Sequence, residues 1–228
     1  TTQYEWLTNE LANSTATWRL MANQNMMGGW FTNGLPPIGP VPDSPVFDDS
    51  SWDGYILERE LFLNYLIDNE IGNNIMLSGD AHISVAMDLS PYPLDSTYYN
   101  PLTGEGAIGV EFLPTSISRG NFDEFGLPSN LINGVTNASM SVNPHHVFFQ
   151  ITEHGYGLMR IAADSCLAEY WYSDILAPSE EETLGAAYVV RDGENHWDRQ
   201  ALGGAYVQGV GVNPAPTAPK PALHINNH

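Results

Sequence analysis

Asp80 and His82 are the two side chains whose types and spacing point most clearly to chemistry, and they end the segment NIMLSGDAH at 74–82. A carboxylate oxygen and an imidazole nitrogen are suitable ligands for a divalent or trivalent metal ion. The two residues are two positions apart, so in extended backbone both side chains would point to the same side. Because this spacing is short and common, the alternative stays open: Asp80 caps a following helix, and His82 is packed or solvated.

A helix and a strand would deliver this pair to the edge of a sheet. Residues 75–77 form an apolar run that predicts a buried strand, and Gly79 permits a sharp turn at its end. Residues 52–71 read as an amphipathic helix. Its expected apolar face comprises Leu57, Leu61, Tyr65, Phe62 and Leu66. Ligands bind at the carboxyl ends of strands in α/β sheets, so this order of elements favours a ligand site at Asp80.

A series of short motifs runs along roughly residues 2–165. They are QYEWL at 3–7 with STATW at 14–18, WDGY at 52–55 with ER at 58–59, LSGDAH at 77–82, EF at 111–112 with TSIS at 115–118, NPH at 143–145 and HGY at 154–156. In this order, they resemble the C-terminal half of the PhoD-like alkaline phosphatase/phosphodiesterase family, within the calcineurin-like metallophosphatases.

The resemblance implies a fold, a reaction and a pair of metals. The expected fold is α/β, the C-terminal half of a metallophosphatase-like αββα sandwich with a mixed sheet and helices on its outer face. The implied reaction is hydrolysis of phosphomonoesters or phosphodiesters at a centre holding Ca2+ and Fe3+. Asp80 would be an oxygen ligand suited to calcium, and His82 a nitrogen ligand suited to iron.

The resemblance also implies that most metal ligands come from an N-terminal half that precedes the matching part. A two-metal site needs more ligands than Asp80 and His82 can provide. We therefore expect a separate chain or segment to supply that half, and the isolated chain to be inactive. The alternative is a non-catalytic structural or interaction protein that reuses the phosphatase scaffold. Neither reading fixes the oligomeric state, and a homo-oligomer is possible under both.

Asp53 and Arg119 are the candidates for substrate binding. Asp53 stands at the start of the predicted helix, where it would either cap that helix or line the metal cleft. Arg119 follows a Ser/Thr-rich turn, and a guanidinium suits bidentate recognition of phosphate. The alternative for Arg119 is a salt bridge, which so acidic a protein would favour.

Other polar residues have less certain roles. Glu111 lies inside an apolar run, so its carboxylate needs a partner, structural or functional. His145, His146 and His154 stand at predicted strand ends, where they are either metal or phosphate contacts or turn and packing residues. Cys166 is the single cysteine, which excludes a disulfide within the chain and indicates a core residue.

The composition excludes some classes of function. Twenty-seven acidic residues against seven basic ones give a formal charge of −20, which argues against a nucleic-acid-binding surface. Solubility, or alternatively a calcium-binding surface, would account for the excess carboxylate. A hydrophobic fraction of 43% favours a packed globular structure, and no apolar stretch is long enough to span a membrane. The family is typically exported, so the resemblance implies a periplasmic or extracellular location.

The chain divides into two parts: residues 1–200, the phosphatase-like lobe, and residues 201–228, a Gly/Ala/Pro-rich tail that is either disordered or lies on a partner. Residues 28–51, rich in proline and glycine, predict a long loop. Residues 144–174 predict a meander of three β-strands. The remaining predicted elements are a helix at 3–12 and strands at 18–27, 106–113 and 186–190.

Overall fold

The computed structural model of the protein describes residues 2–33, residue 35 and residues 46–199. The predicted tail at 201–228 and part of the predicted loop at 28–51, namely residues 34 and 36–45, therefore lie outside the described residues. In the described part of the chain, no helix is both long and apolar enough to cross a membrane.

The helices and strands follow one another in a mixed order. They are α1 (Thr2–Asn13), β1 (Arg19–Ala22), the 3-10 helix η1 (Trp52–Tyr55), α2 (Ile56–Asp68), β2 (Asn74–Leu77), β3 (Ser84–Leu89), β4 (Gly109–Leu113), the 3-10 helix η2 (Phe122–Phe125), α3 (Ser129–Val142), β5 (His146–Gln150), β6 (Gly155–Ile161), β7 (Ser165–Tyr172) and β8 (Thr183–Arg191).

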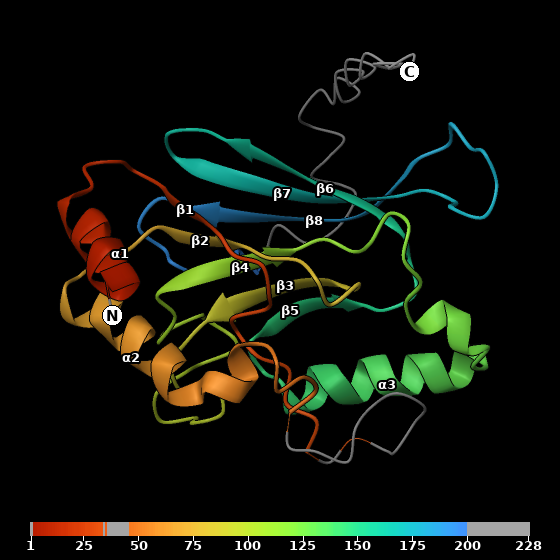
Figure 1. Ribbon diagram of the computed structural model, residues 1–228, viewed down its shortest axis with the longest axis horizontal. Helices are drawn as coiled ribbons and strands as arrows, with labels where there is room; N and C mark the ends of the chain where they lie inside the picture. The colour runs from red at the N-terminus through yellow and green to blue at the C-terminus, as the bar shows by residue number, and fades with distance from the viewer. Residues whose placement is uncertain (1, 34, 36–45, 200–228) are drawn as a thin grey trace, which may run out of the picture.

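Two sheets are stacked on each other (Figure 1). Within the described residues, the first sheet has five strands in the order β1-β2-β4-β3-β5. Strands β1, β2 and β4 are parallel, whereas β3 runs antiparallel to both β4 and β5. The second sheet is an antiparallel meander in the order β6-β7-β8. The predicted α/β class with a mixed sheet is confirmed.

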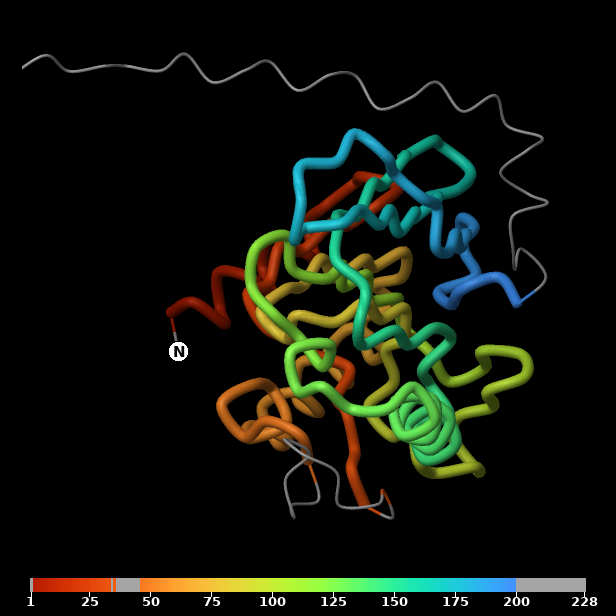
Figure 2. Tube along the Cα trace, turned by 90° about the vertical axis from the view of Figure 1, so that its right-hand side faces the viewer, coloured from red at the N-terminus to blue at the C-terminus, as the bar shows by residue number. Residues whose placement is uncertain are grey.

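The mixed sheet is the middle layer, and this explains its apolar sequence. Every residue of β3 and β4 is buried. Alternate side chains face opposite layers: Val85 and Met87 pack with Val135 of α3, whereas Ala86 packs with Tyr170 of β7. At the other end of the same face, α1 and α2 cover the sheet (Figures 1 and 2). A strand buried on both faces reads as a continuous apolar run rather than an alternating one.

The core between the two sheets contains Cys166. Its side chain is fully buried and unpaired, as predicted for a core cysteine. Burial raises the pKa of its thiol to about 11, so the residue stays protonated and unreactive at neutral pH.

The helix α2 buries a different face from the predicted one. Phe62, Leu63 and Leu66 pack against the sheet, but Leu57 and Leu61 are 82% and 56% exposed. The sequence contains two apolar rows, one with residues 57 and 61 and the other with residues 62, 63 and 66. Only the second row is buried against the sheet. The prediction of one wide buried face was therefore wrong.

The predicted three-stranded meander at 144–174 is also corrected. Its first strand, β5, pairs with β3 in the mixed sheet, and the turn at 151–154 leads the chain into the second sheet. The meander is completed instead by β8, which extends the predicted strand at 186–190. Strand patterns indicate where strands lie, but they do not identify which strands pair.

Candidate active site

A cleft of about 370 Å³ opens beyond the C-terminal end of β2. We call it the phosphate cleft because Arg119, the residue predicted to bind phosphate, lines it. Its polar lining comprises Asn25, Asp48, Ser51, Asp80, His82, Arg119, Asn121 and Glu124. Three of the residues predicted from sequence, Asp80, His82 and Arg119, are thus brought to one cavity from separate parts of the chain.

Asp80 and His82 do not lie in extended backbone. Their φ angles are 70° and 57°, in the left-handed region that few non-glycine residues adopt. The prediction that strand geometry aligns them was wrong; a tight turn, in which Ala81 N donates to Gly79 O over 2.9 Å, brings both to the cleft. Each such conformation costs about 1–3 kcal/mol, and such costs cluster at functional sites. Strand β3 follows, so Asp80 does not cap a helix.

Hydrogen bonds hold this turn from two sides. Thr115 Oγ1 lies 3.0 Å from His82 O and 2.9 Å from Glu153 O, so its single proton can bond either carbonyl. On the other side, Asn25 donates to Asp80 Oδ2 over 3.2 Å when its amide nitrogen is oriented toward the cleft. Asp80 itself is exposed and His82 half-buried, so both side chains are accessible to a ligand.

Arg119 differs from every other arginine in the described part of the chain. Its side chain is exposed on the cleft, and its guanidinium makes no hydrogen bond or ion pair with any other residue that the structure describes. The other arginines there bond to carbonyl or carboxylate oxygens, namely Arg19, Arg59, Arg160, Arg191 and Arg199. The salt bridge considered as an alternative is therefore not formed, and the guanidinium is free to bind an oxyanion.

Asp53 faces the interior rather than the phosphate cleft. Its fully buried carboxylate forms an ion pair with Arg59 over 2.6 Å and accepts a hydrogen bond from Trp30 N over 2.9 Å. The cap of η1 is Ser51, whose side chain accepts from Asp53 N. This placement gives Asp53 a structural partner, and it does not favour the predicted contact with substrate.

Asp53 belongs to a ring of buried polar side chains around the segment 27–31. Glu111 accepts from Met27 N over 2.8 Å and from Gly28 N over 2.6 Å. We call this ring the polar cradle, and its members are Asp53, Arg59, Glu111, Asn143, His145 and His146. A Cβ at Gly29, whose φ is +86°, would lie 2.6 Å from Asp53 Oδ1, so the cradle requires glycine there. The partner expected for Glu111 is thus the backbone.

The two histidines of the cradle are neutral donors rather than metal ligands. His145 Nε2 and His146 Nε2 lie 3.2 Å and 2.9 Å from Gly29 O. Burial, together with the neighbouring His146, holds the pKa of His145 well below its usual range, and burial lowers the pKa of His146 to about 4. Burial raises the pKa of Glu111, against the effect of the Met27 and Gly28 N–H groups.

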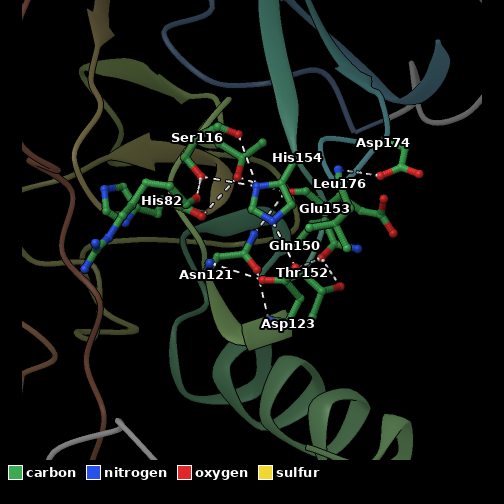
Figure 3. Close-up of polar contacts among 12 residues, drawn as sticks. His82, Ser116, Asn121, Asp123, Gln150, Thr152, Glu153, His154, Asp174 and Leu176 are labelled. Carbon is green, nitrogen blue, oxygen red and sulfur yellow. Dashed lines mark hydrogen bonds and ion pairs between the residues drawn. The ribbon is translucent and has the colours of Figure 1, made fainter. Parts of the chain in front are cut away.

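His154 lies behind the loop that carries Arg119. Its Nδ1 is 3.3 Å from both Ser116 O and Ser116 Oγ, and its Nε2 is 3.2 Å from Asp123 Oδ2 (Figure 3). The ring borders a second groove of about 650 Å³, separate from the phosphate cleft. Of the three predicted candidate histidines, His154 alone contacts the loop that carries Arg119.

Sequence reasoning missed several residues of the cleft. Asn25, Asp48 and Glu124 were not among the candidate site residues. Phe47 and Phe125 form an apolar part of the wall. None of these residues belongs to a pattern with a fixed spacing, because loops distant in the sequence bring them to the site.

The residues present fit part of a metal site. Asp80 and His82 are chemically suitable ligands on one cleft. Among the described residues, however, no group of three or more His, Cys, Asp or Glu side chains is placed to hold a metal ion. A complete centre would therefore require donors from outside the described residues.

Comparisons with known proteins agree with this architecture. The sequence profile of the PhoD-like phosphatases matches residues 1–170. Alkaline phosphatase D of Bacillus subtilis (strain 168) is 30% identical over 173 residues, which cover 74% of this chain and 25% of that protein. A solved structure of PhoD superposes with a TM-score of 0.64 at 25% identity, over 87% of this chain and 34% of that one. The chain thus spans about a quarter to a third of these relatives, and it belongs to the PhoD-like phosphatase family.

Proposed function

We propose that this chain forms one side of the active centre of a metal-dependent phosphatase that hydrolyses phosphomonoesters or phosphodiesters. The observation that carries the proposal is the phosphate cleft, where Asp80, His82 and an unpaired Arg119 line one cavity. Family membership supports both the hydrolytic reaction and its dependence on metal ions.

Each of the three residues has a distinct role in this proposal. Asp80 holds Ca2+ through its carboxylate oxygens, and His82 holds Fe3+ through an imidazole nitrogen. Metal ions held there would supply Lewis-acid polarisation of the phosphoryl group and a nucleophile at neutral pH. Arg119 binds the non-bridging phosphoryl oxygens through two parallel N–H groups, which orients the ester for in-line attack.

The remaining metal ligands come from an N-terminal half of the enzyme, on another chain or segment. Two surfaces support such a partner. Within the described residues, no strand pairs with the outer edge of β1, and Leu57 and Leu61 of α2 are exposed. An unpaired strand edge and an exposed apolar face are both places where another segment can add. By this proposal, the 228 residues alone are inactive, and the complete enzyme acts in the periplasm or outside the cell.

Metal analysis of the complete protein tests the proposal. We expect Asp80→Asn and His82→Asn each to lose bound metal and phosphatase activity, because the first removes the negative charge of the carboxylate and the second removes the imidazole nitrogen. Asparagine tolerates the left-handed backbone at both positions, so the turn is preserved. Glu180→Gln changes an exposed carboxylate away from the cleft and serves as the control. Full metal content in both cleft variants would contradict the proposal and favour the non-catalytic alternative.

A further inference from the structure

We infer that His154 is a positioning residue, which holds the loop at 115–123 so that Arg119 faces the phosphate cleft. The inference rests on the proposed function, because it assigns His154 a role through the residue that binds phosphate. His154 itself does not line the cleft; it lies on the opposite side of the loop (Figure 3).

The loop that carries Arg119 is closed by its own side chains. Ser116 Oγ donates to the carbonyl oxygen of Arg119. At the far end, Asn121 Oδ1 accepts from Asp123 N over 3.0 Å and begins η2. Between these two closures, residues 117–119 are exposed. The direction of the Arg119 side chain therefore depends on where Ser116 and Asp123 are held.

His154 connects both closures of the loop. Its Nδ1 lies near the oxygens of Ser116, and its Nε2 faces the Asp123 carboxylate. Because Ser116 Oγ uses its proton toward Arg119, the polar atoms around both ring nitrogens are acceptors. The ring therefore bridges Ser116 and Asp123, one nitrogen facing each. The ring is 6% exposed, so packing fixes its orientation.

The turn that carries His154 is itself tied to the loop. Gly155 N donates to Ser116 O over 3.2 Å, and Asn121 Nδ2 donates to Glu153 O over 3.1 Å. Phe122 N also donates to Ile151 O over 3.2 Å. The turn at 151–155 is thus a rigid support from which one buried side chain reaches both ends of an exposed loop. The exposed loop presents one charged side chain, that of Arg119, to the cleft.

The test compares phosphate binding in variants of the complete, metal-loaded enzyme. We expect His154→Ala to raise both KM and the inhibition constant of inorganic phosphate by about tenfold, the usual scale for one misplaced charge-assisted hydrogen bond. Metal content and kcat should change little. His154→Gln retains one of the two contacts, so its effect should lie between the parent and His154→Ala. Asp123→Asn keeps the fold of the loop while weakening one contact, and it replaces His154→Ala if that variant does not fold.

A double variant shows whether His154 acts through Arg119. Arg119→Ala should raise the phosphate inhibition constant by itself, and adding His154→Ala should raise it no further. His196→Ala, in a histidine outside the cleft, is the matched control. Additive effects, or an unchanged inhibition constant in both His154→Ala and Asp123→Asn, would overturn the inference while leaving the proposed function intact. An Arg119→Ala variant with unchanged phosphate binding would overturn both the inference and the proposed role of Arg119 in substrate binding. The remainder of the proposed function is tested separately, by metal loss in the Asp80 and His82 variants.

Discussion

The polar cradle and the phosphate cleft are both built from charged and hydrogen-bonding side chains, but they use them in opposite ways. In the cradle, Asp53, Glu111 and Arg59 are buried and bonded to backbone or to one another. In the cleft, Asp80 adopts a strained backbone and Arg119 has no partner. Buried ion pairs and hydrogen bonds to the backbone are typical of a structural role, whereas an exposed charge beside a cavity indicates binding or catalysis.

Because of this difference, substitutions in the two regions should affect different properties of the protein. Changes in the cradle should unfold the protein without a specific effect on metal binding. Changes in the cleft should abolish function with little loss of stability.

The largest effect on stability is expected from Asp53→Ala. It leaves the Arg59 guanidinium buried without its carboxylate, which costs about 3–5 kcal/mol. Asp80→Asn, at an exposed position, should change the unfolding free energy by less than about 0.5 kcal/mol. Urea unfolding of both variants measures the contrast, and similar stabilities for the two would remove the distinction between the regions.

A second effect on stability is expected from acidification of the cradle. Both His145 and His146 have lowered pKa values, so the folded state binds fewer protons than the unfolded state. Their contribution to stability is complete above the usual histidine pKa of 6.5 and is lost as the pH falls through about 4. Each group contributes a slope of up to about 1.4 kcal/mol per pH unit in that window.

His146→Phe keeps an aromatic ring at this position and removes one titrating group. Unfolding free energies measured from pH 7 to pH 4 should therefore fall less steeply in this variant than in the parent. Glu111, whose pKa burial raises, contributes in the opposite sense, so the parent and the variant must be compared directly. Parallel pH profiles would show that the imidazole of His146 is not buried in its neutral form.

The smallest effect is expected outside both regions, on α2. Leu57→Gln should change stability by less than about 0.5 kcal/mol in the 228-residue chain, since Leu57 is 82% exposed. Leu63→Ala, on the buried face, should cost about 2–5 kcal/mol. Thermal unfolding distinguishes them. A large loss for Leu57→Gln in the complete enzyme only would support a partner segment on that face.

The sequence predicted the elements that hold Asp80 and His82 better than the arrangement around them. Residues 75–77 were expected as a buried strand, and they form most of β2. Strand β3 and helix α3 were not expected, because β3 has no polar alternation and α3 carries many Ser and Asn residues. The family motifs led to Asp80 and His82, yet the left-handed turn that aims them depends on tertiary contacts. The buried ion pair of Asp53 was not expected, because its partner, Arg59, lies six positions further along the chain on the next helix, α2.

The central claim is that Asp80 and His82 hold metal ions on the wall of the phosphate cleft. Anomalous X-ray scattering from crystals of the complete enzyme, grown with Ca2+ and Fe3+ and measured on both sides of the iron absorption edge, tests it most directly. The account predicts an iron peak within bonding distance of a His82 ring nitrogen and a second metal at the Asp80 carboxylate. Metal peaks bound elsewhere in the enzyme, with both side chains free, would contradict it.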